Sequence, residues 1–249
     1  MMIVRAIVLG LELDMVEPAT LPLIDYEKDY VFSAFTPMQL KNFAKYLKNI
    51  KTVIVGGGRV SKPIIESIKD KKPHVYETYG MTETVSHIAV KKLNNFSGSE
   101  KDNYFTTLPE IKVSQDERGC LVIEAPKILD SKIVTNDIVE LKSDSSFKWL
   151  GRIDNVVNSG GIKLFPEEIE NKIQDKIQGE FFIASKADDT LGDKLIIVIE
   201  GDKKDLDDSI FNELDKYEKP KEIIFISKFK LTNSGKIHRK KTLEVLNII

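Results

Sequence analysis

Hydrophobic and polar positions in the first third of the chain alternate between short apolar runs and longer stretches with helical spacing. The apolar runs predict strands, and the segments in which apolar residues recur every three or four positions predict helices. This alternation is typical of a mainly parallel sheet with helices on its faces. The strands are expected at Tyr30–Phe35, Thr52–Val55 and His74–Glu77, and the helices at Pro37–Leu47 and Lys62–Lys71, the latter capped by Ser61.

Two later regions have different patterns. From Ile111 to Leu150, short strands separated by polar turns predict a small antiparallel sheet or barrel. After Asp154, helices and strands mix again, as in a compact α+β unit. The antiparallel strands are expected at Lys112–Ser114, Leu121–Glu124, Ile133–Thr135, Ile138–Lys142 and Phe147–Leu150. The α+β unit is expected to hold helices at Pro166–Lys176, at Lys204–Tyr217 and from Arg239, and strands at Phe181–Ser185, Lys194–Glu200 and Glu222–Ile226.

These patterns predict an α/β protein of two domains that divide near Arg152–Asn155. Residues 1–151 are expected to form most of a large α/β domain with a small β-barrel subdomain from about residue 111, and residues 152–249 a small α+β domain. The polar stretch Asn94–Asn103 is the best candidate for a mobile loop.

The first residues are apolar, yet their pattern differs from that of a signal peptide or a transmembrane helix. Arg5, Glu12 and Asp14 interrupt the apolar run, and no small-residue cleavage site follows it. The pattern predicts a helix that ends near Gly10 and then a strand at Leu11–Glu17. A helix this apolar should pack into a core from its first residue, so we expect the chain to begin within a larger domain.

Composition narrows the classes of function. Of the 249 residues, 41% are hydrophobic and 31% charged, which fits a globular protein and not a disordered one. The net charge of −2 gives no basic field for nucleic acid. Cys120 is the single cysteine, which excludes an internal disulfide and a cysteine-rich zinc site and fits a reducing cytoplasm.

Two segments that follow predicted strands are candidates for ligand binding. Gly56–Gly58 would let a ligand approach the backbone at the carboxyl edge of the sheet, although a plain tight turn explains the glycines as well. In Tyr79–Glu83, the tyrosine ring offers a stacking face, Thr82 a hydroxyl for a phosphate and Glu83 a carboxylate for Mg²⁺. The alternative for this second segment is a strand end followed by a helix cap.

Three further segments carry charge or paired glycines. Asp137 could hold ribose hydroxyls, although an Asn-Asp hairpin turn is the simpler explanation. Lys236 lies in a polar turn and could neutralise a transferring phosphoryl group, or belong to a solvated basic tail. The run Gly151–Glu170 combines a charged turn, the pair Gly160-Gly161 and a helix start at Pro166, which suits a ligand loop or hinge as well as a plain surface turn.

In order and spacing, these segments resemble the adenylate-forming superfamily, which includes acyl-CoA synthetases, adenylation domains of peptide synthetases and luciferases. Within it, the chain is similar to the o-succinylbenzoate–CoA ligases of menaquinone biosynthesis. Three stretches carry this similarity: Y-E-T-Y-G-M-T-E-T-V-S-H-I-A-V-K-K-L-N, T-N-D-I-V-E-L and W-L-G-R-I-D-N-V-V-N-S-G-G-I-K-L. The resemblance extends over essentially the whole chain.

The resemblance implies a role for each matching residue. The expected nucleotide site consists of Gly56, Gly57, Gly58, Tyr79, Gly80, Asp137 and Arg152, of which the last two would hold the ribose. Thr82 would bind the α-phosphate, Glu83 the Mg²⁺ ion, and Lys236 would stabilise the adenylation transition state. Asp154 would be the hinge about which the second domain rotates as a lid, and Gly160 and Gly161 would line the CoA tunnel. His87 would lie near the acid pocket or pack as an ordinary strand histidine.

The implied activity is an ATP-dependent acid–CoA ligase of two steps. A carboxylate, here an aromatic one, is adenylated by ATP with Mg²⁺, and coenzyme A then displaces AMP. The resemblance implies neither nucleic acid nor membrane insertion, and it is compatible with a homodimer.

One part of the family pattern is missing from this sequence. The family carries a phosphate loop, roughly T-S-G-T-T-G-x-P-K, and no such stretch occurs here. We therefore expect a chain that lacks the amino-terminal part of the large domain and has little ligase activity by itself. The alternatives are an aryl- or fatty-acid–CoA ligase and a non-catalytic fragment that still binds AMP.

Overall fold

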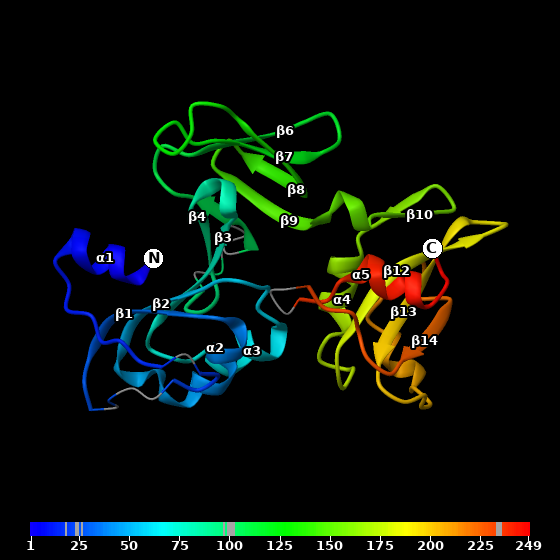
Figure 1. The fold of residues 1–249 in the computed structure, drawn as a ribbon, viewed down its shortest axis with the longest axis horizontal. Coiled ribbons are helices and arrows are strands. Elements are labelled where there is room, and N and C mark those ends of the chain that lie inside the picture. Colours follow the sequence, from blue (N-terminus) through cyan, green and yellow to red (C-terminus); the bar gives the residue numbers. More distant parts are fainter. Residues whose placement is uncertain (18, 23–24, 26, 97, 99–102, 233–235) are drawn as a thin grey trace. The chain divides into compact units, whose positions relative to one another are not determined.

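The computed structural model describes residues 1–17, 19–22, 25, 27–96, 98, 103–232 and 236–249. Contacts between Cα atoms divide the chain into two compact units. The first unit comprises residues 1–135 and 139–149, and the second comprises residues 136–138 and 150–249 (Figure 1). Each unit has its own hydrophobic cores.

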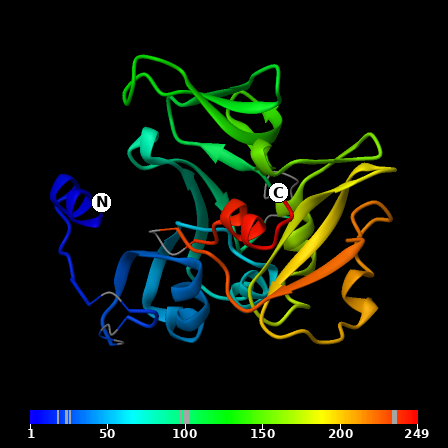
Figure 2. The same cartoon turned by 45° about the vertical axis from the view of Figure 1, so that its right-hand side comes forward.

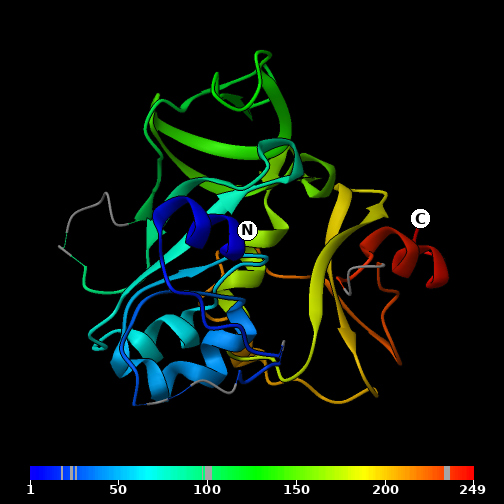
Figure 3. The same cartoon turned by 60° about the vertical axis from the view of Figure 1, so that its left-hand side comes forward.

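Three parallel strands begin the sheet of the first unit, in the order of the sequence. They are β1 (Tyr30–Phe35), β2 (Ile50–Val55) and β3 (His74–Gly80). The helices α2 (Pro37–Phe43) and α3 (Lys62–Ile68) and the short turn η1 (Ala44–Asn49) supply side chains to the core that covers one face of these strands (Figure 3). The predicted alternation of strands and helices is confirmed. The helices α2 and α3 do not cover the second face of these strands.

The start of α2 is determined locally. Thr36 and Gln39 form a reciprocal capping box, in which the Thr36 hydroxyl accepts from the Gln39 N–H at 3.2 Å and the Gln39 amide oxygen accepts from the Thr36 N–H at 2.9 Å. Pro37 follows at a position where its missing N–H costs nothing. Ser61 does occupy the capping position of α3, but its side chain makes no capping hydrogen bond.

The antiparallel region continues the same sheet. Among the described residues, nine strands follow one another in the order β1-β2-β3-β4-β5-β9-β8-β7-β6. The additional strands are β4 (His87–Lys92), β5 (Phe105–Thr107), β6 (Lys112–Gln115), β7 (Cys120–Glu124), β8 (Ile133–Ser143) and β9 (Ser146–Arg152). The predicted break between Thr135 and Ile138 is wrong, since β8 runs through both residues, and the alternative of an Asn-Asp hairpin turn at Asp137 fails with it.

The second unit is built around a strand that is buried on both faces. β13 (Gly192–Glu200) pairs with β10 (Val157–Ser159), β12 (Phe181–Asp188) and β14 (Glu222–Ile226), and β10 also pairs with β11 (Ile162–Leu164). Odd positions of β12 and β13 join a core with α4 (Pro166–Ile173), and even positions join a core with α5 (Arg239–Val245), seen beside the strands in Figure 2. A strand whose two faces are both covered reads as a continuous apolar run, as residues 195–199 do.

Three further predictions made from the sequence are wrong: the strand at residues 11–17, the packing of the first helix into a core, and the helix at Lys204–Tyr217. The helix α1 (Met2–Leu9) does end at Gly10, whose φ of 63° is left-handed, but residues 11–17 form no strand and only Ala6 of the helix is buried. The helix expected at Lys204–Tyr217 is reduced to the short turn η5 (Asp208–Phe211). There the Asp207 carboxylate accepts the Ser209 N–H at 2.8 Å and caps η5, so the turn begins at Asp208 and not at Lys204.

The predicted loop at Asn94–Asn103 begins on a firmly held residue. Asn94 is fully buried, and its amide donates to backbone oxygens of Ile68, Lys71 and Pro73 while its oxygen accepts the Val75 N–H. Asn94 is therefore a fixed junction between α3 and β3. Residues 97 and 99–102 of the expected loop lie outside the described residues. No helix in the described ranges is both long and apolar enough to cross a bilayer.

Candidate functional site

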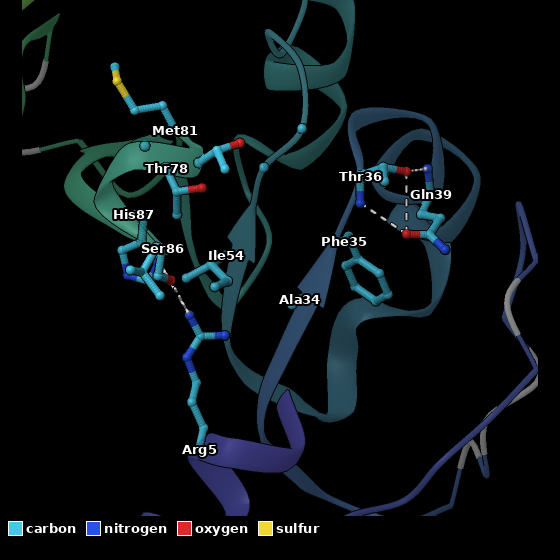
Figure 4. Close-up of a pocket in the computed structure, with 15 residues that line it drawn as sticks. Arg5, Ala34, Phe35, Thr36, Gln39, Ile54, Thr78, Met81, Ser86 and His87 are labelled. Atoms are coloured by element: carbon cyan, nitrogen blue, oxygen red, sulfur yellow. Dashed lines mark hydrogen bonds between the residues drawn. The ribbon is translucent and has the colours of Figure 1, made fainter. Parts of the chain in front are cut away.

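A cavity of about 500 Å³ opens at the carboxyl ends of the parallel strands, on the face that α2 and α3 leave uncovered. Ala34 of β1 and Ile54 of β2 form its floor, and the segment from Thr78 to His87 forms one wall (Figure 4). Gly56, Gly57, Gly80 and Thr82, which the sequence predicted as ligand-binding residues, all line it. The carboxyl edge of a parallel sheet is the place where such folds bind ligands.

The glycines after β2 are required for two different reasons. A Cβ on Gly56 would lie 2.8 Å from the Thr78 hydroxyl oxygen, which itself donates to the Val55 carbonyl at 3.0 Å. Gly57 has a φ of 85°, a conformation that strains other residues. Gly58 is exposed and is not part of the cavity lining. The strand-to-helix turn therefore leaves bare backbone at the cavity.

A buried ion pair holds this turn to the neighbouring strand. Glu77 of β3 is 5% exposed, and its carboxylate accepts the Val60 N–H at 3.2 Å and lies 2.6 Å from the Lys91 ammonium of β4. Hydrogen bonding and a partner charge together compensate the cost of burying a carboxylate. Glu77 thus fixes the position of the glycine turn relative to β3 and β4.

The cavity wall after β3 contains a strained turn. A Cβ on Gly80 would lie 2.5 Å from the Ser86 carbonyl oxygen, so the chain returns on itself there in a way that only glycine permits. Val85 has φ 61° and ψ −44°, and the Ser86 N–H donates to the Thr84 carbonyl at 2.6 Å across it. This is a γ-turn at a β-branched residue, which is an unfavourable backbone conformation. The turn directs Ser86 and His87 back toward the cavity.

Arg5 supplies a positive charge that sequence reasoning missed. Its guanidinium lies 3.2 Å from the His87 Nδ1 and donates to the Ser86 hydroxyl at 3.4 Å (Figure 4). Burial and the nearby Arg5 charge both lower the pKa of His87, so the imidazole is neutral at pH 7. Within the described lining there is no aspartate or glutamate, and Arg5 makes the cavity suited to an anion. In the sequence, this charge is visible as a single arginine within an apolar helix.

Tyr79 and Glu83 lie beside the cavity and do not line it. The Tyr79 ring packs against Phe105 and Phe147 with centroids 5.8 and 5.2 Å away, within the antiparallel core. Glu83 is exposed in the short turn η2 (Thr82–Thr84). Within the described part of the chain, no three His, Cys, Asp or Glu residues gather as a metal site.

In the second unit, the two residues expected to hold ribose face each other. The Arg152 guanidinium at the end of β9 lies 3.6 Å from the carboxylate of Asp137 on β8 and 3.0 Å from that of Asp154. Asp137 is 10% exposed and Arg152 45% exposed. Asp154 lies in the turn η4 (Ile153–Asn155). Strand pairing thus brings together carboxylate and guanidinium groups that are 15 residues apart in the sequence.

Lys236 is exposed on a hairpin next to a smaller cavity of the second unit. Leu231 and Ile237 form an isolated antiparallel bridge, and the Thr232 N–H donates to the Lys236 carbonyl at 2.8 Å. The cavity, of about 270 Å³, is lined by Arg152, Asp154, Asn155, Thr232, Ile237, His238 and Arg239. The expected hinge residue and the lysine hairpin therefore border the same hollow.

Gly160 and Gly161 form the tip of the hairpin between β10 and β11. Their φ values of 56° and 82° are both left-handed, as a two-residue hairpin turn requires. The Gly160 N–H donates to the Leu191 carbonyl at 2.9 Å, which ties the tip to β13.

Comparison with known proteins decides the family. No family model matches the chain. In a structure of an AMP-forming acyl-CoA synthetase and AMP-acid ligase II-like protein from Dyadobacter fermentans, 35% of aligned residues are identical, with a TM-score of 0.53 over 92% of this chain and 69% of that protein. The chain belongs to the AMP-forming acyl-CoA synthetase family.

Other relatives agree with this assignment. A 2-succinylbenzoate–CoA ligase from Listeria monocytogenes (serotype 4b) is 30% identical over 223 residues, which are 80% of this chain and 47% of the relative. The o-succinylbenzoate coenzyme A synthetase of Bacillus subtilis, solved with ATP and magnesium ion, matches the fold with a TM-score of 0.73 at 19% identity. The similarity to o-succinylbenzoate–CoA ligases and the predicted fold class are confirmed. The chain spans about half the length of the curated relatives it matches.

Proposed function

We propose that this chain carries the acid pocket, the ribose site and the lid of an ATP-dependent acid–CoA ligase. The acid is proposed to be o-succinylbenzoate and the product o-succinylbenzoyl-CoA. The observation that carries the proposal is the cavity in which Gly56, Gly80 and Thr82 present polar backbone and hydroxyl groups beside the charge of Arg5. The ligase names of the relatives support it. A cytoplasmic location and a homodimer stay predictions.

The proposed first step is attack of the acid's carboxylate oxygen on the α-phosphorus of ATP. The bond from that phosphorus to the bridging oxygen of pyrophosphate breaks, and acyl-AMP and pyrophosphate result. Thr82 would donate to the α-phosphate, and the exposed Glu83 would hold a Mg²⁺ ion whose other ligands come from phosphate and water. Bound magnesium neutralises negative charge on the phosphates.

The remaining nucleotide contacts are proposed for Asp137, Arg152 and the aromatic face of Tyr79. The Asp137 carboxylate has the geometry to accept from ribose hydroxyls, with Arg152 beside it at 3.6 Å. Tyr79 would need to offer one face to adenine while its edge packs on Phe147. Gly57 and Gly58 leave room for the base.

The second step uses the same acyl carbon. The thiol sulfur of coenzyme A bonds to the carbonyl carbon of acyl-AMP, the bond to the AMP oxygen breaks, and the thiol proton is lost to solvent. We propose that the second unit turns about Asp154 between the steps, withdraws Lys236 and presents the Gly160–Gly161 turn. One site that serves two reactions requires such a movable element.

Arg5 is proposed to select the substrate. o-Succinylbenzoate has two carboxylates, one to be activated and a second to be recognised. A guanidinium on the wall of the cavity binds a carboxylate strongly through charge-assisted hydrogen bonds. Replacing Arg5 by Gln should raise KM for o-succinylbenzoate about 10-fold or more, while a benzoate without the second carboxylate should be unaffected. Equal loss for both acids would contradict this role and favour an aryl- or fatty-acid–CoA ligase.

Lys236→Ala, made in a version of the protein that carries the phosphate loop, tests the adenylation mechanism. Removing a cation that stabilises the transition state should lower the rate of acyl-AMP formation by about 10²–10³. Lys240→Ala is the matched control, because Lys240 is an exposed lysine of the same segment. Acyl-AMP formation is followed by exchange of labelled pyrophosphate into ATP. If the Lys236 variant adenylates the acid at the wild-type rate, the mechanism is wrong.

The 249-residue chain is itself proposed to turn over slowly, because its sequence contains no T-S-G-T-T-G-x-P-K stretch to hold the β- and γ-phosphates. An assay of AMP release should show activity near background. Near-normal turnover would contradict this. The second candidate, a non-catalytic AMP-binding fragment, predicts calorimetric binding of AMP with no added affinity for ATP and Mg²⁺.

A further inference from the structure

Arg239 anchors the segment that carries Lys236. It is the first residue of α5, three positions after the lysine, and its side chain is 23% exposed. One guanidinium nitrogen donates to Glu170 Oε2 at 2.8 Å and the other to the Ile183 carbonyl at 3.1 Å. The guanidinium also lies over the Phe182 ring, 5.5 Å from its centroid. Arg239 is thus held by α4 and β12 at the same time.

The base of the lysine hairpin is joined to the same helix. The His238 N–H donates to the Lys230 carbonyl at 2.7 Å, which closes the hairpin. The Thr242 hydroxyl, fully buried, accepts the Lys230 N–H at 3.2 Å and donates to the His238 carbonyl at 3.1 Å. Both arms of the hairpin therefore connect to the first turn of α5, whose place is set by Arg239.

The cluster also reaches the turn that holds Asp154. Glu167, one turn before Glu170 on α4, accepts from the Asn155 side-chain amide at 2.5 Å and lies 3.9 Å from the Arg239 guanidinium. A Cβ on Gly151 would lie 2.5 Å from the second carboxylate oxygen of Glu167, so that carboxylate is packed tightly under the end of β9. A continuous chain of contacts leads from Asn155 through Glu167 to Arg239.

We infer that Arg239, held by Glu170 and Glu167, is a positioning residue that fixes the direction in which the hairpin presents Lys236 and ties the hairpin to the Asp154 turn. The catalytic consequence rests on the proposed function, in which Lys236 acts on the nucleotide. A buried ion pair contributes little net stability but is well suited to select one geometry. The cluster would make the hairpin and the Asp154 turn move as one body when the second unit rotates.

The first test needs no catalytic activity. Hydrogen exchange of the 249-residue chain, read by mass spectrometry, is compared between wild type and Glu170→Gln, with Glu244→Gln as a control on an exposed glutamate of α5. We expect protection of amides in residues 230–232 and 236–242 to fall about 10-fold in Glu170→Gln, because a hydrogen bond to a charged group is lost. Protection of β13 should be unchanged. Unchanged protection of the hairpin, or an equal loss throughout the second unit, overturns the inference.

Arg239→Lys supplies a second variant in case Glu170→Gln folds poorly. Lysine keeps the charge but can satisfy fewer of the acceptors, so hairpin protection should lie between wild type and Glu170→Gln. In the double variant, Glu170→Gln with Arg239→Lys, protection should be no lower than in the worse single variant, since the two residues act as a unit. Additive losses would overturn the inference.

The second test separates the two half-reactions. In Glu170→Gln, kcat for acyl-AMP formation should fall about 10-fold with little change in KM, while thioester formation from supplied acyl-AMP should stay within about 2-fold of wild type. Equal loss in both half-reactions indicates a merely structural role and overturns the inference. Both half-reactions are measured in a version of the protein that carries the phosphate loop; if that version with Glu170 intact forms no acyl-AMP, the proposed function fails, and hydrogen exchange alone decides whether the cluster positions the hairpin.

Discussion

Two arginine–carboxylate pairs in the second unit share their chemistry and differ in their surroundings. Arg152 is 45% exposed and lies 3.6 Å from Asp137, whereas Arg239 is 23% exposed and lies 2.8 Å from Glu170, with a backbone carbonyl and an aromatic ring as further partners. In the first pair only the Arg152 guanidinium is open to a ligand, because the Asp137 side chain is 10% exposed. In the second pair the Arg239 guanidinium is engaged by a carboxylate, a backbone carbonyl and an aromatic ring, and it also borders the smaller cavity. The exposure and partners of each guanidinium therefore support the binding role proposed for Arg152 and the positioning role proposed for Arg239.

The largest expected difference between the two pairs is in stability. Arg239→Ala leaves the largely buried Glu170 carboxylate without its guanidinium partner and should lower the free energy of unfolding of the second unit by about 3–5 kcal/mol. Arg152→Ala removes a partly exposed pair and should cost less than about 1 kcal/mol. Urea unfolding read by hydrogen exchange in β13 measures both. Equal costs would break the comparison.

The pH dependence of stability is the next largest effect. Burial raises the pKa of Glu170 from 4.5 to about 7, against the lowering effects of Arg239 and the Ile183 N–H, and Glu167 adds a smaller raising effect. These are the groups that face Glu170 from α5, β12 and α4. Between these pH values the folded protein keeps a proton that the unfolded chain has lost, so stability falls as pH rises from about 4.5 to about 7, with a limiting slope of about 1.4 kcal/mol per unit.

The matched variants for this slope are Glu170→Gln and Glu244→Gln. Glu170→Gln removes the titrating carboxyl group, so the free energy of unfolding should depend less on pH. Glu244→Gln should leave this pH dependence as in wild type. The measurement is urea unfolding at pH 4.5, 5.5, 6.5 and 7.5, a series chosen to span the window given by the pKa of about 7. An unchanged slope in Glu170→Gln would show that another group carries it.

The Arg152 variant should lose affinity for the nucleotide although it keeps most of its stability. Arg152→Gln should weaken AMP binding about 10-fold, because a charge-assisted contact near the ribose is lost, and leave the fold intact. Isothermal calorimetry with AMP measures this. If the Arg152 variant binds AMP as tightly as wild type, Arg152 is not part of the proposed site, and the proposed difference between Arg152 and Arg239 is wrong.

A third charged cluster, around Glu222, should show the smallest change in stability when it is disrupted. Glu222 is 32% exposed and binds Lys186 at 2.8 Å and Lys194 at 3.1 Å, and these two lysines lower its pKa. Its stabilisation is present above the ordinary pKa of 4.5 and is lost as pH falls below that value, the reverse of Glu170. Glu222→Gln should cost less than about 1 kcal/mol at pH 7. A larger cost, measured by the same unfolding experiment, would mean that exposure does not rank these pairs.

Local patterns in the sequence were sufficient for much of the fold. The bounds of β1 and β14 match those predicted, since apolar runs flanked by polar turns determine a strand without help from distant residues. Gly160 and Gly161 were placed correctly in a turn because left-handed backbone favours glycine. The late start of η5 within Lys204–Tyr217 is a local effect as well, because Asp207 caps the turn through the Ser209 N–H.

The order of the motifs along the chain, and with it the family, could be established from sequence alone. The contacts that give the site its chemistry could not. Arg5 meets His87 across 82 positions, and Arg239 meets Glu170 across 69. Such pairs leave no periodic signal, because sheet order and helix packing bring them together and neighbouring residues do not. Local propensity therefore determined the elements, and long-range packing determined which charges are buried and which remain available to a ligand.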